Sequence, residues 1–252
     1  MRLAAALCAL AFWAASAAAA PASASIDAIH LEMLVQRIAK LDTQVKQGVM
    51  VPRSRRALDA AMREFDEALR EAHAEAPAGE LRETYALLTL LWMQFRSWHS
   101  GGGDVVQKLR ERTDEMAWIA SKAARLVQES ARATSNAQAV RAGNAAVLAQ
   151  RVAKIHLWML RDLRDETLAR DLRDSDENLH RLIQALREAP APSPVVEAEI
   201  ANAQSQARFM DDAVRELGTP ASRARAVEFI AKTGDNITES MERAARLYVA
   251  AP

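Results

Sequence analysis

The chain contains one seven-residue pattern twice, as LVQRIAK at residues 34–40 and as LAQRVAK at residues 148–154. The offset of 114 positions between the copies also relates three apolar pairs, Phe65 with Leu179, Leu69 with Ile183, and Phe95 with Phe209. Towards the C-terminus, AARL at residues 123–126 returns at residues 244–247, which is seven positions later than that offset predicts. Seven residues are about two helical turns, so the register on a helix face is kept. The sequence therefore indicates the duplication of one whole unit.

Outside this pattern, the composition is typical of helices. Ala, Leu, Arg and Glu dominate, and the 252 residues include only 8 glycines and 8 prolines. These breakers divide most of the chain into about eight segments, in which apolar residues recur every three or four positions. We therefore predict an all-α protein of about eight helices, arranged as two tandem four-helix bundles that span residues 25–136 and 137–252.

Residues 1–24 have the features of a signal peptide: a basic Arg2, an Ala-rich apolar run, and the small residues Ala22-Ser23-Ala24. An uncleaved membrane anchor is the alternative, because the run is nearly long enough to cross a bilayer. We expect cleavage, and hence a periplasmic or secreted protein. Leu7 directly before Cys8 argues against a lipoprotein signal. Since Cys8 is the only cysteine, the mature chain would contain neither disulfides nor thiol nucleophiles.

Charge and motif content exclude several classes of function. Lys plus Arg equals Asp plus Glu at 33 each, with both signs interspersed, which argues against nucleic-acid binding. No later apolar stretch reaches 18 residues, so we expect no membrane span after signal cleavage. Without a phosphate loop, a nucleophile elbow or paired catalytic carboxylates, we predict no catalytic residues, no cofactor and no enzyme activity. Only Glu177-Asn178-Leu179-His180 has the Glu-x-x-His spacing of helical metal sites, and we predict no metal site, with His180 on the surface.

The polar members of the repeated pattern are the candidate ligand-binding residues. They are Gln36, Arg37, Lys40, Gln150, Arg151 and Lys154. On a helical wheel, each arginine lies roughly 70° from the centre of its apolar stripe, at the seam between core and solvent, while the glutamines and lysines face further outward. A seam arginine has two interpretations. It either pairs with a carboxylate of a neighbouring helix, or it holds a small anion or carboxylate, which suits its planar fork of donors.

The segment around this pattern resembles the PilJ-type domain, the N-terminal sensor domain of type IV pili methyl-accepting chemotaxis transducers. That domain is related to the sensor domain of nitrate/nitrite (NarX-like) histidine kinases. The family's first helix carries a motif close to AGRQRMLSQR, followed by a hydrophobic residue, any residue and lysine. The second repeat here reads AGNAAVLAQRVAK at residues 142–154, and the first reads HLEMLVQRIAK at residues 30–40. WMQF at residues 92–95 fits the family's later W-x-x-F motif, and QARF at residues 206–209 fits it in part.

The resemblance covers essentially the whole chain after the signal peptide, as two copies, and it implies a four-helix sensor bundle. The family arginine that the related sensors use to hold nitrate is replaced by Glu32 in the first repeat and by Ala146 in the second. A preceding motif arginine is replaced by Asn144. Only Arg37 and Arg151 carry over, and an acidic Glu32 would repel nitrate.

These observations lead to two functional hypotheses. The first is an exported, sensor-like helical binding module without its own signalling output, because the chain ends where the related sensors continue into a membrane helix. Its expected partners are a small anion or carboxylate and a membrane-bound signalling protein. The alternative is a structural or protein-interaction scaffold with no small-molecule ligand. The sequence leaves the oligomeric state open.

Two structural features would separate these hypotheses. A water-accessible pocket lined by Arg37 or Arg151 favours the sensor, whereas two arginines neutralised by carboxylates across a closed seam favour the scaffold. If the family's sensors pair their first helices in a homodimer, the duplication predicts that one chain does so internally. The two helices that carry the repeated pattern would then lie side by side about a pseudo-twofold axis.

Overall fold

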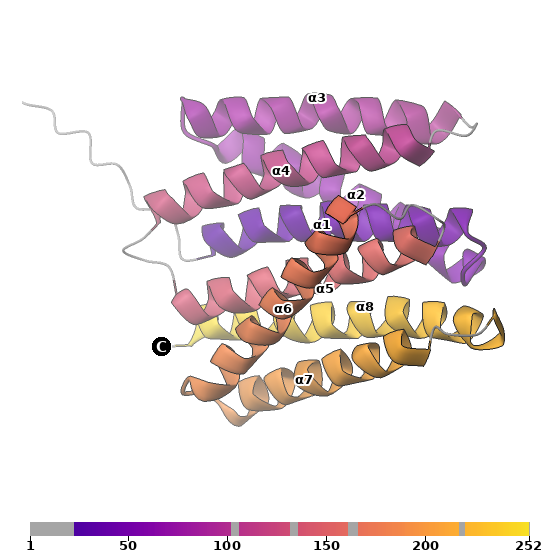
Figure 1. Ribbon diagram of the computed structural model, residues 1–252. Coiled ribbons are helices and arrows are strands. Elements are labelled where there is room, and N and C mark those ends of the chain that lie inside the picture. The colour runs from indigo at the N-terminus through magenta and orange to yellow at the C-terminus, as the bar shows by residue number, and fades with distance from the viewer. Residues whose placement is uncertain (1–22, 102–105, 132–135, 161–165, 217–219, 252) are drawn as a thin grey trace, which may run out of the picture.

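The computed structural model describes residues 23–101, 106–131, 136–160, 166–216 and 220–251. The regular elements of this part of the chain are α-helices without a strand (Figure 1), which confirms the all-α prediction. They are α1 (Ala24–Lys46), α2 (Val51–Glu75), α3 (Glu80–Gly101), α4 (Val106–Ser130), α5 (Ala137–Leu160), α6 (Glu166–Glu188), α7 (Pro194–Arg215) and α8 (Pro220–Ala250). All but the last two residues of the expected signal peptide, residues 1–24, lie outside the described residues.

Each repeat forms its own ring of four helices. In the first, α1 packs against α2 and α4, and α3 closes the ring by packing against the same two helices. In the second, α5 packs against α6 and α8, and α7 closes the ring in the same way. The four helices of one repeat therefore correspond in order to the four of the other. Figure 1 shows the two bundles one below the other, in agreement with the predicted tandem arrangement.

Local sequence signals account for the helix ends. Ser193 precedes α7, and its hydroxyl oxygen accepts a hydrogen bond from the Val196 amide at 3.4 Å, while Pro194 occupies the first helical position. In the turn between α1 and α2, Gly48 adopts a φ of 75°, which glycine tolerates without a steric penalty. Such breakers could be recognised in the sequence because only residues with this backbone freedom or rigidity suit these turns.

The two central helices, α1 and α5, pack against each other (Figure 1). Trp158 Nε1 donates a hydrogen bond to Thr43 Oγ1 at 3.0 Å, and Gln47 Nε2 donates one to the Leu157 carbonyl oxygen at 2.7 Å. Helices joined by direct side-chain bonds lie about one helix diameter apart. The prediction that the two helices carrying the repeated pattern lie side by side is therefore confirmed.

Most buried apolar side chains of both repeats belong to one connected core. It includes Leu34 of α1, Phe65 of α2 and Leu179 of α6, each with a side chain that is essentially inaccessible to solvent. Close helix packing extends this core into α8, where a Cβ on Gly234 would lie only 2.8 Å from the Ala153 Cβ. The two bundles thus share one interior, and α1 and α5 are at its centre.

None of the described helices combines the length and the low polarity that are needed to cross a membrane.

Candidate functional site at the repeat interface

The glutamines and lysines of the repeated pattern are buried, although the helical wheel places them further outward. Their exposed fractions are 1% for Gln36, 0% for Lys40, 0% for Gln150 and 2% for Lys154. The prediction is wrong because a wheel treats each helix as part of an isolated bundle. Here α1 and α5 cover each other, so the face that would meet solvent in a single bundle meets the other repeat instead.

Each buried lysine reaches into the other repeat. Lys40 Nζ of α1 donates to Asp235 Oδ1 of α8 at 2.5 Å and to the Ala231 carbonyl oxygen at 3.3 Å. Lys154 Nζ of α5 donates to Asp114 Oδ1 of α4 at 3.2 Å. Asp114 and Asp235 are related by the C-terminal offset of 121 positions, as the lysines are by 114. The two ion pairs are therefore pseudo-symmetric copies that join one repeat to the other.

The electrostatics of the Lys40 pair follow from its burial. Burial lowers the pKa of Lys40, and the Asp235 carboxylate opposes this shift without cancelling it. Burial alone would raise the pKa of Asp235, but Lys40 outweighs this, so the carboxyl pKa lies below its ordinary value. Gln150 Nε2 also donates to Asp235 Oδ1 at 3.0 Å, which further favours the ionised carboxylate. We regard Asp235 as a buried anion held by both repeats.

Arg151 is neutralised within the second repeat. Its Nη2 donates to Asp171 Oδ1 of α6 at 2.6 Å, and the same oxygen accepts a hydrogen bond from Ser175 Oγ at 3.2 Å. The largely buried Glu32 of α1 adds a second carboxyl group in the field of this arginine. Burial raises the pKa of Glu32 to about 7, although Arg151 and Arg125 oppose the shift. The Asp171 carboxylate thus balances the charge of Arg151, and the Glu32 carboxyl group of the other repeat lies in the field of the same arginine.

Arg37 occupies the equivalent place in the first repeat, where both of these carboxyl groups are missing. The position that corresponds to Asp171 is Ala57, and the one that corresponds to Glu32 is Ala146. Within the described residues, no hydrogen bond or ion pair to the Arg37 guanidinium is found. Its buried Nε lacks a partner, as the Nε of Arg151 does, but Arg151 binds Asp171 through Nη2. The pattern arginines are therefore equivalent by position but different by environment.

Two carboxylates, Glu64 and Asp235, interact with the charge of Arg37, but both already bind other groups. Arg37 lowers the pKa of Glu64 and of Asp235 through its field, but Glu64 Oε1 accepts a hydrogen bond from His30 Nε2 at 3.0 Å, and Asp235 is bound to Lys40. Lys40 and Arg53 add positive charge to the same region. The region around Arg37 thus contains other cations, Lys40 and Arg53, and its carboxylates are already bound to other side chains.

His30 is a further link between the repeats that the sequence did not single out. Its Nδ1 lies 2.5 Å from Glu242 Oε1 of α8, and its Nε2 lies 3.0 Å from Glu64 Oε1 of α2. Burial alone would lower the pKa of His30, but the two glutamates raise it to about 9. An imidazolium between two carboxylates explains this shift. No spacing rule could have found the site, because Glu242 is 212 positions from His30.

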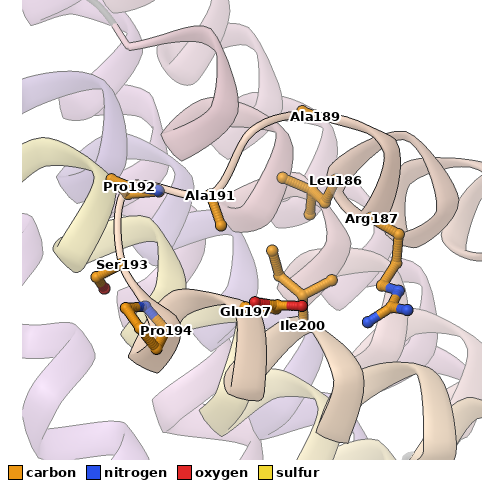
Figure 2. A pocket seen from close by; sticks show the side chains of 9 residues that line it. All are labelled: Leu186, Arg187, Ala189, Ala191, Pro192, Ser193, Pro194, Glu197 and Ile200. Carbon is orange, nitrogen blue, oxygen red and sulfur yellow. The ribbon is translucent and has the colours of Figure 1, made fainter.

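Two hollows in the described part of the chain lie away from the candidate arginines. A cavity of about 70 Å³ lies beside His30, Ala146 and Glu242, at the meeting of α1, α5 and α8. A wider one, of about 480 Å³, lies at the turn from α6 to α7, and Figure 2 shows Arg187, Glu197 and Pro192 among the side chains that line it. Neither arginine of the repeated pattern lines these two hollows. Arg37 is instead half-buried in the seam between helices. These two hollows are therefore not the arginine-lined pocket expected of a sensor, and the neutralisation expected of a scaffold is found for Arg151 but not for Arg37.

Comparison of the chain with family models, with curated proteins and with solved structures finds no match. The resemblance to PilJ-type sensor domains therefore stays a prediction, carried by the motifs alone.

Proposed function

We propose that the protein is an exported, sensor-like binding module that holds one small carboxylate or similar anion at Arg37. The observation that carries this proposal is the difference between the two arginines. Arg151 has an internal carboxylate at 2.6 Å, whereas Arg37 has alanines at the two equivalent positions. In the second repeat the Asp171 carboxylate binds the arginine, and in the first repeat a carboxylate from solution would take the same position beside Arg37.

The chemistry of the guanidinium supports a carboxylate as the ligand. Its planar fork of donors matches two oxygens of one carboxylate, and such charge-assisted bonds are among the strong ones in proteins. Arg53 adds a further positive charge to this region, where the Asp235 carboxylate is already bound by Lys40. Because α1 packs against α2, α4 and α5, the backbone that carries the arginine is fixed before the ligand arrives, which lowers the entropy lost on binding.

Thermal unfolding of the purified protein against acetate, succinate, nitrate and phosphate tests the proposal. A ligand that binds only the folded state stabilises it by about 2.7 kcal/mol at a hundredfold excess over its dissociation constant. We expect a rise in Tm with at least one carboxylate, which Arg37→Ala abolishes and the matched control Arg151→Ala retains. The variant Ala57→Asp should also abolish the rise, because it gives Arg37 the internal partner that Arg151 has. No rise with any anion would contradict the proposal.

The scaffold is the second candidate function, and an exposed apolar groove between α3 and α4 favours it. Trp118 is 63% exposed there, and Leu87, Leu91 and Ile119 line the groove beside it. Asp114 and Glu115 lie on its rim with about half of each side chain exposed, and each also forms an ion pair within the chain, with Lys154 and Arg112 respectively. An apolar groove with acidic edges fits an amphipathic helix that carries Lys or Arg beside its apolar face.

A synthetic basic amphipathic helix would test this groove. Trp118 is the most exposed of the described tryptophans, so binding should shift its fluorescence to shorter wavelength. The variant Trp118→Phe should lose the signal, and a peptide with glutamate in place of lysine should bind weakly or not at all. Equal binding of both peptides would contradict a charge-matched docking groove.

A further inference from the structure

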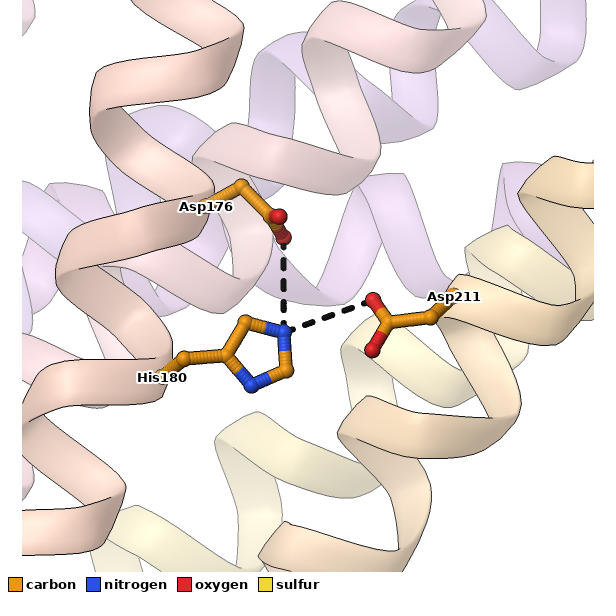
Figure 3. Close-up of side chains that lie close together, drawn as sticks. All are labelled: Asp176, His180 and Asp211. Carbon is orange, nitrogen blue, oxygen red and sulfur yellow. Dashed lines mark hydrogen bonds and ion pairs between the residues drawn. The ribbon is translucent and has the colours of Figure 1, made fainter.

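Three side chains from two helices converge on one point of the second bundle. Asp176 and His180 lie one turn apart on the same face of α6, and Asp211 faces them from α7 (Figure 3). His180 Nε2 is 3.3 Å from Asp211 Oδ1 and 3.8 Å from Asp176 Oδ1. One ligand atom from each of the three residues lies within 4.8 Å of the others.

We propose that Asp176, His180 and Asp211 form a binding site for one divalent transition-metal ion, with Zn²⁺ as its best-suited occupant. This goes beyond the function proposed for Arg37, because it concerns a different bundle and a different class of ligand. It also departs from the sequence-based prediction that the chain has no metal site.

The spacing of the three ligand atoms fits such an ion. Tetrahedral zinc with bonds of about 2.0–2.2 Å places its ligand atoms about 3.3–3.6 Å apart. The two distances from His180 Nε2, 3.3 and 3.8 Å, are already close to this range. The third separation, between the two aspartate oxygens, is within 4.8 Å, so the carboxylates must move inward to bind one ion. The side chain of Asp176 is 37% exposed and has room to do so.

The arrangement of donors and acceptors also favours an ion over a simple hydrogen bond. The same ring nitrogen faces both carboxylates (Figure 3), yet one N–H group can point along only one of these directions. A cation among the three atoms uses the nitrogen lone pair and both carboxylate oxygens at once. It also removes the repulsion between two aspartates that converge on one place.

The donor set selects among metals. One imidazole nitrogen and two carboxylate oxygens suit a borderline ion such as Zn²⁺, whereas Mg²⁺ and Ca²⁺ prefer oxygen alone. Three protein ligands leave at least one coordination position for water. The ion can enter from solvent, because His180 is 40% exposed and Asp211 is 30% exposed.

The first repeat does not contain this set of ligands. The equivalents of Asp176, His180 and Asp211 are Met62, Asp66 and Ser97. Asp66 instead accepts hydrogen bonds from Trp92 Nε1 at 2.5 Å and from Arg96 Nη1 at 2.8 Å. Both bundles thus join their second and third helices at this level with polar side chains, but only the second offers three metal-binding groups.

Zinc binding to the intact protein, freed of metal with a chelator and measured by isothermal titration calorimetry, tests the site. We expect one equivalent of Zn²⁺ to bind and to raise Tm. Loss of a residue that only supports a metal ligand weakens binding by roughly 10–100-fold. Because His180→Ala removes a ligand itself, it should weaken zinc binding by more than this. Asp211→Asn, which keeps the shape of the side chain, should weaken it as well, and circular dichroism should confirm that both variants are folded.

His73→Ala is the matched control, since it removes a histidine of α2 that lies outside the cluster. It should bind zinc like the unaltered protein. Co²⁺ offers an independent readout, because its visible absorption reports coordination by nitrogen and oxygen and should vanish in His180→Ala. Absence of zinc binding to the unaltered protein, or equal binding by His180→Ala, would overturn the proposal.

Discussion

In the two repeats, the lysines of the repeated pattern have the same kind of partner, whereas the arginines do not. Lys40 and Lys154 are both buried, and both bind an aspartate of the opposite repeat. Arg151 is neutralised by Asp171, whereas the first repeat has Ala57 at the position equivalent to Asp171. The lysine pairs are therefore part of the architecture that joins the repeats. The arginines have different partners in the two repeats, so the fold does not require one fixed partner at this position. We therefore place the functional difference between the repeats at the arginines.

The largest effect should come from breaking the shared lysine pairs. Asp235→Ala leaves the fully buried Lys40 ammonium without its partner, and removing one member of a buried pair typically costs about 3–5 kcal/mol. Asp114→Ala should cost less, because Asp114 is half-exposed and water can reach that end of the pair. Urea unfolding of both variants measures the difference. A cost below about 1 kcal/mol for Asp235→Ala would show that the Lys40 pair does not hold the repeats together.

The His30 link, which only the first repeat has, should make stability fall at alkaline pH. The pKa of His30 is raised from 6.5 to about 9 in the folded protein, so the unfolded chain loses this proton first. Its contribution, up to about 3 kcal/mol, is fully present below pH 6.5 and is lost as pH rises through 9. Denaturant unfolding between pH 6 and 10 measures this loss. His30→Gln should flatten the profile, and an unchanged slope in that variant would contradict the assignment.

Glu32 should produce a second loss of stability as pH rises, at a lower pH than the loss that comes from His30. Its pKa is raised from 4.5 to about 7, so the folded protein retains a proton that the unfolded chain releases. Stability from the neutral carboxyl group is present below pH 4.5 and is lost as pH rises through 7. Glu32→Gln should therefore stabilise the protein above pH 7, by about 1–3 kcal/mol. A destabilised variant at pH 8 would instead mean that the ionised Glu32 pairs productively with Arg151.

The smallest effect on stability should come from making the second repeat resemble the first. Asp171→Ala, made in the Glu32→Ala background and compared with Glu32→Ala alone, gives Arg151 the two alanines that Arg37 has. The lost Arg151 to Asp171 pair is about one third exposed, and pairs of this kind contribute roughly 0–1 kcal/mol. The double variant should nevertheless gain a second carboxylate site, which calorimetric titration would detect as doubled stoichiometry. Unchanged stoichiometry would break the proposed equivalence of the two arginines.

Much of the fold could be predicted because its signals are local or repeated. Apolar spacing and breakers indicated the helices, and the duplicated pattern predicted that α1 and α5 lie side by side. The orientation of Gln36 and Lys40 could not be predicted in this way, because the surface that covers them belongs to the other repeat. The same limit applies to His30, whose partner Glu242 is distant in sequence, and to His180. For His180, the Glu-x-x-His spacing pointed to Glu177, whereas the aspartates that converge on it are Asp176 and Asp211.

Calorimetric titration of succinate into the unaltered protein and into Ala57→Asp shows whether the ligand occupies the position beside Arg37 where an internal carboxylate is missing. We predict one bound succinate per chain in the unaltered protein and none in Ala57→Asp, with both proteins folded to the same extent by circular dichroism. Equal binding to both proteins, or binding that persists in Arg37→Ala, would contradict the account.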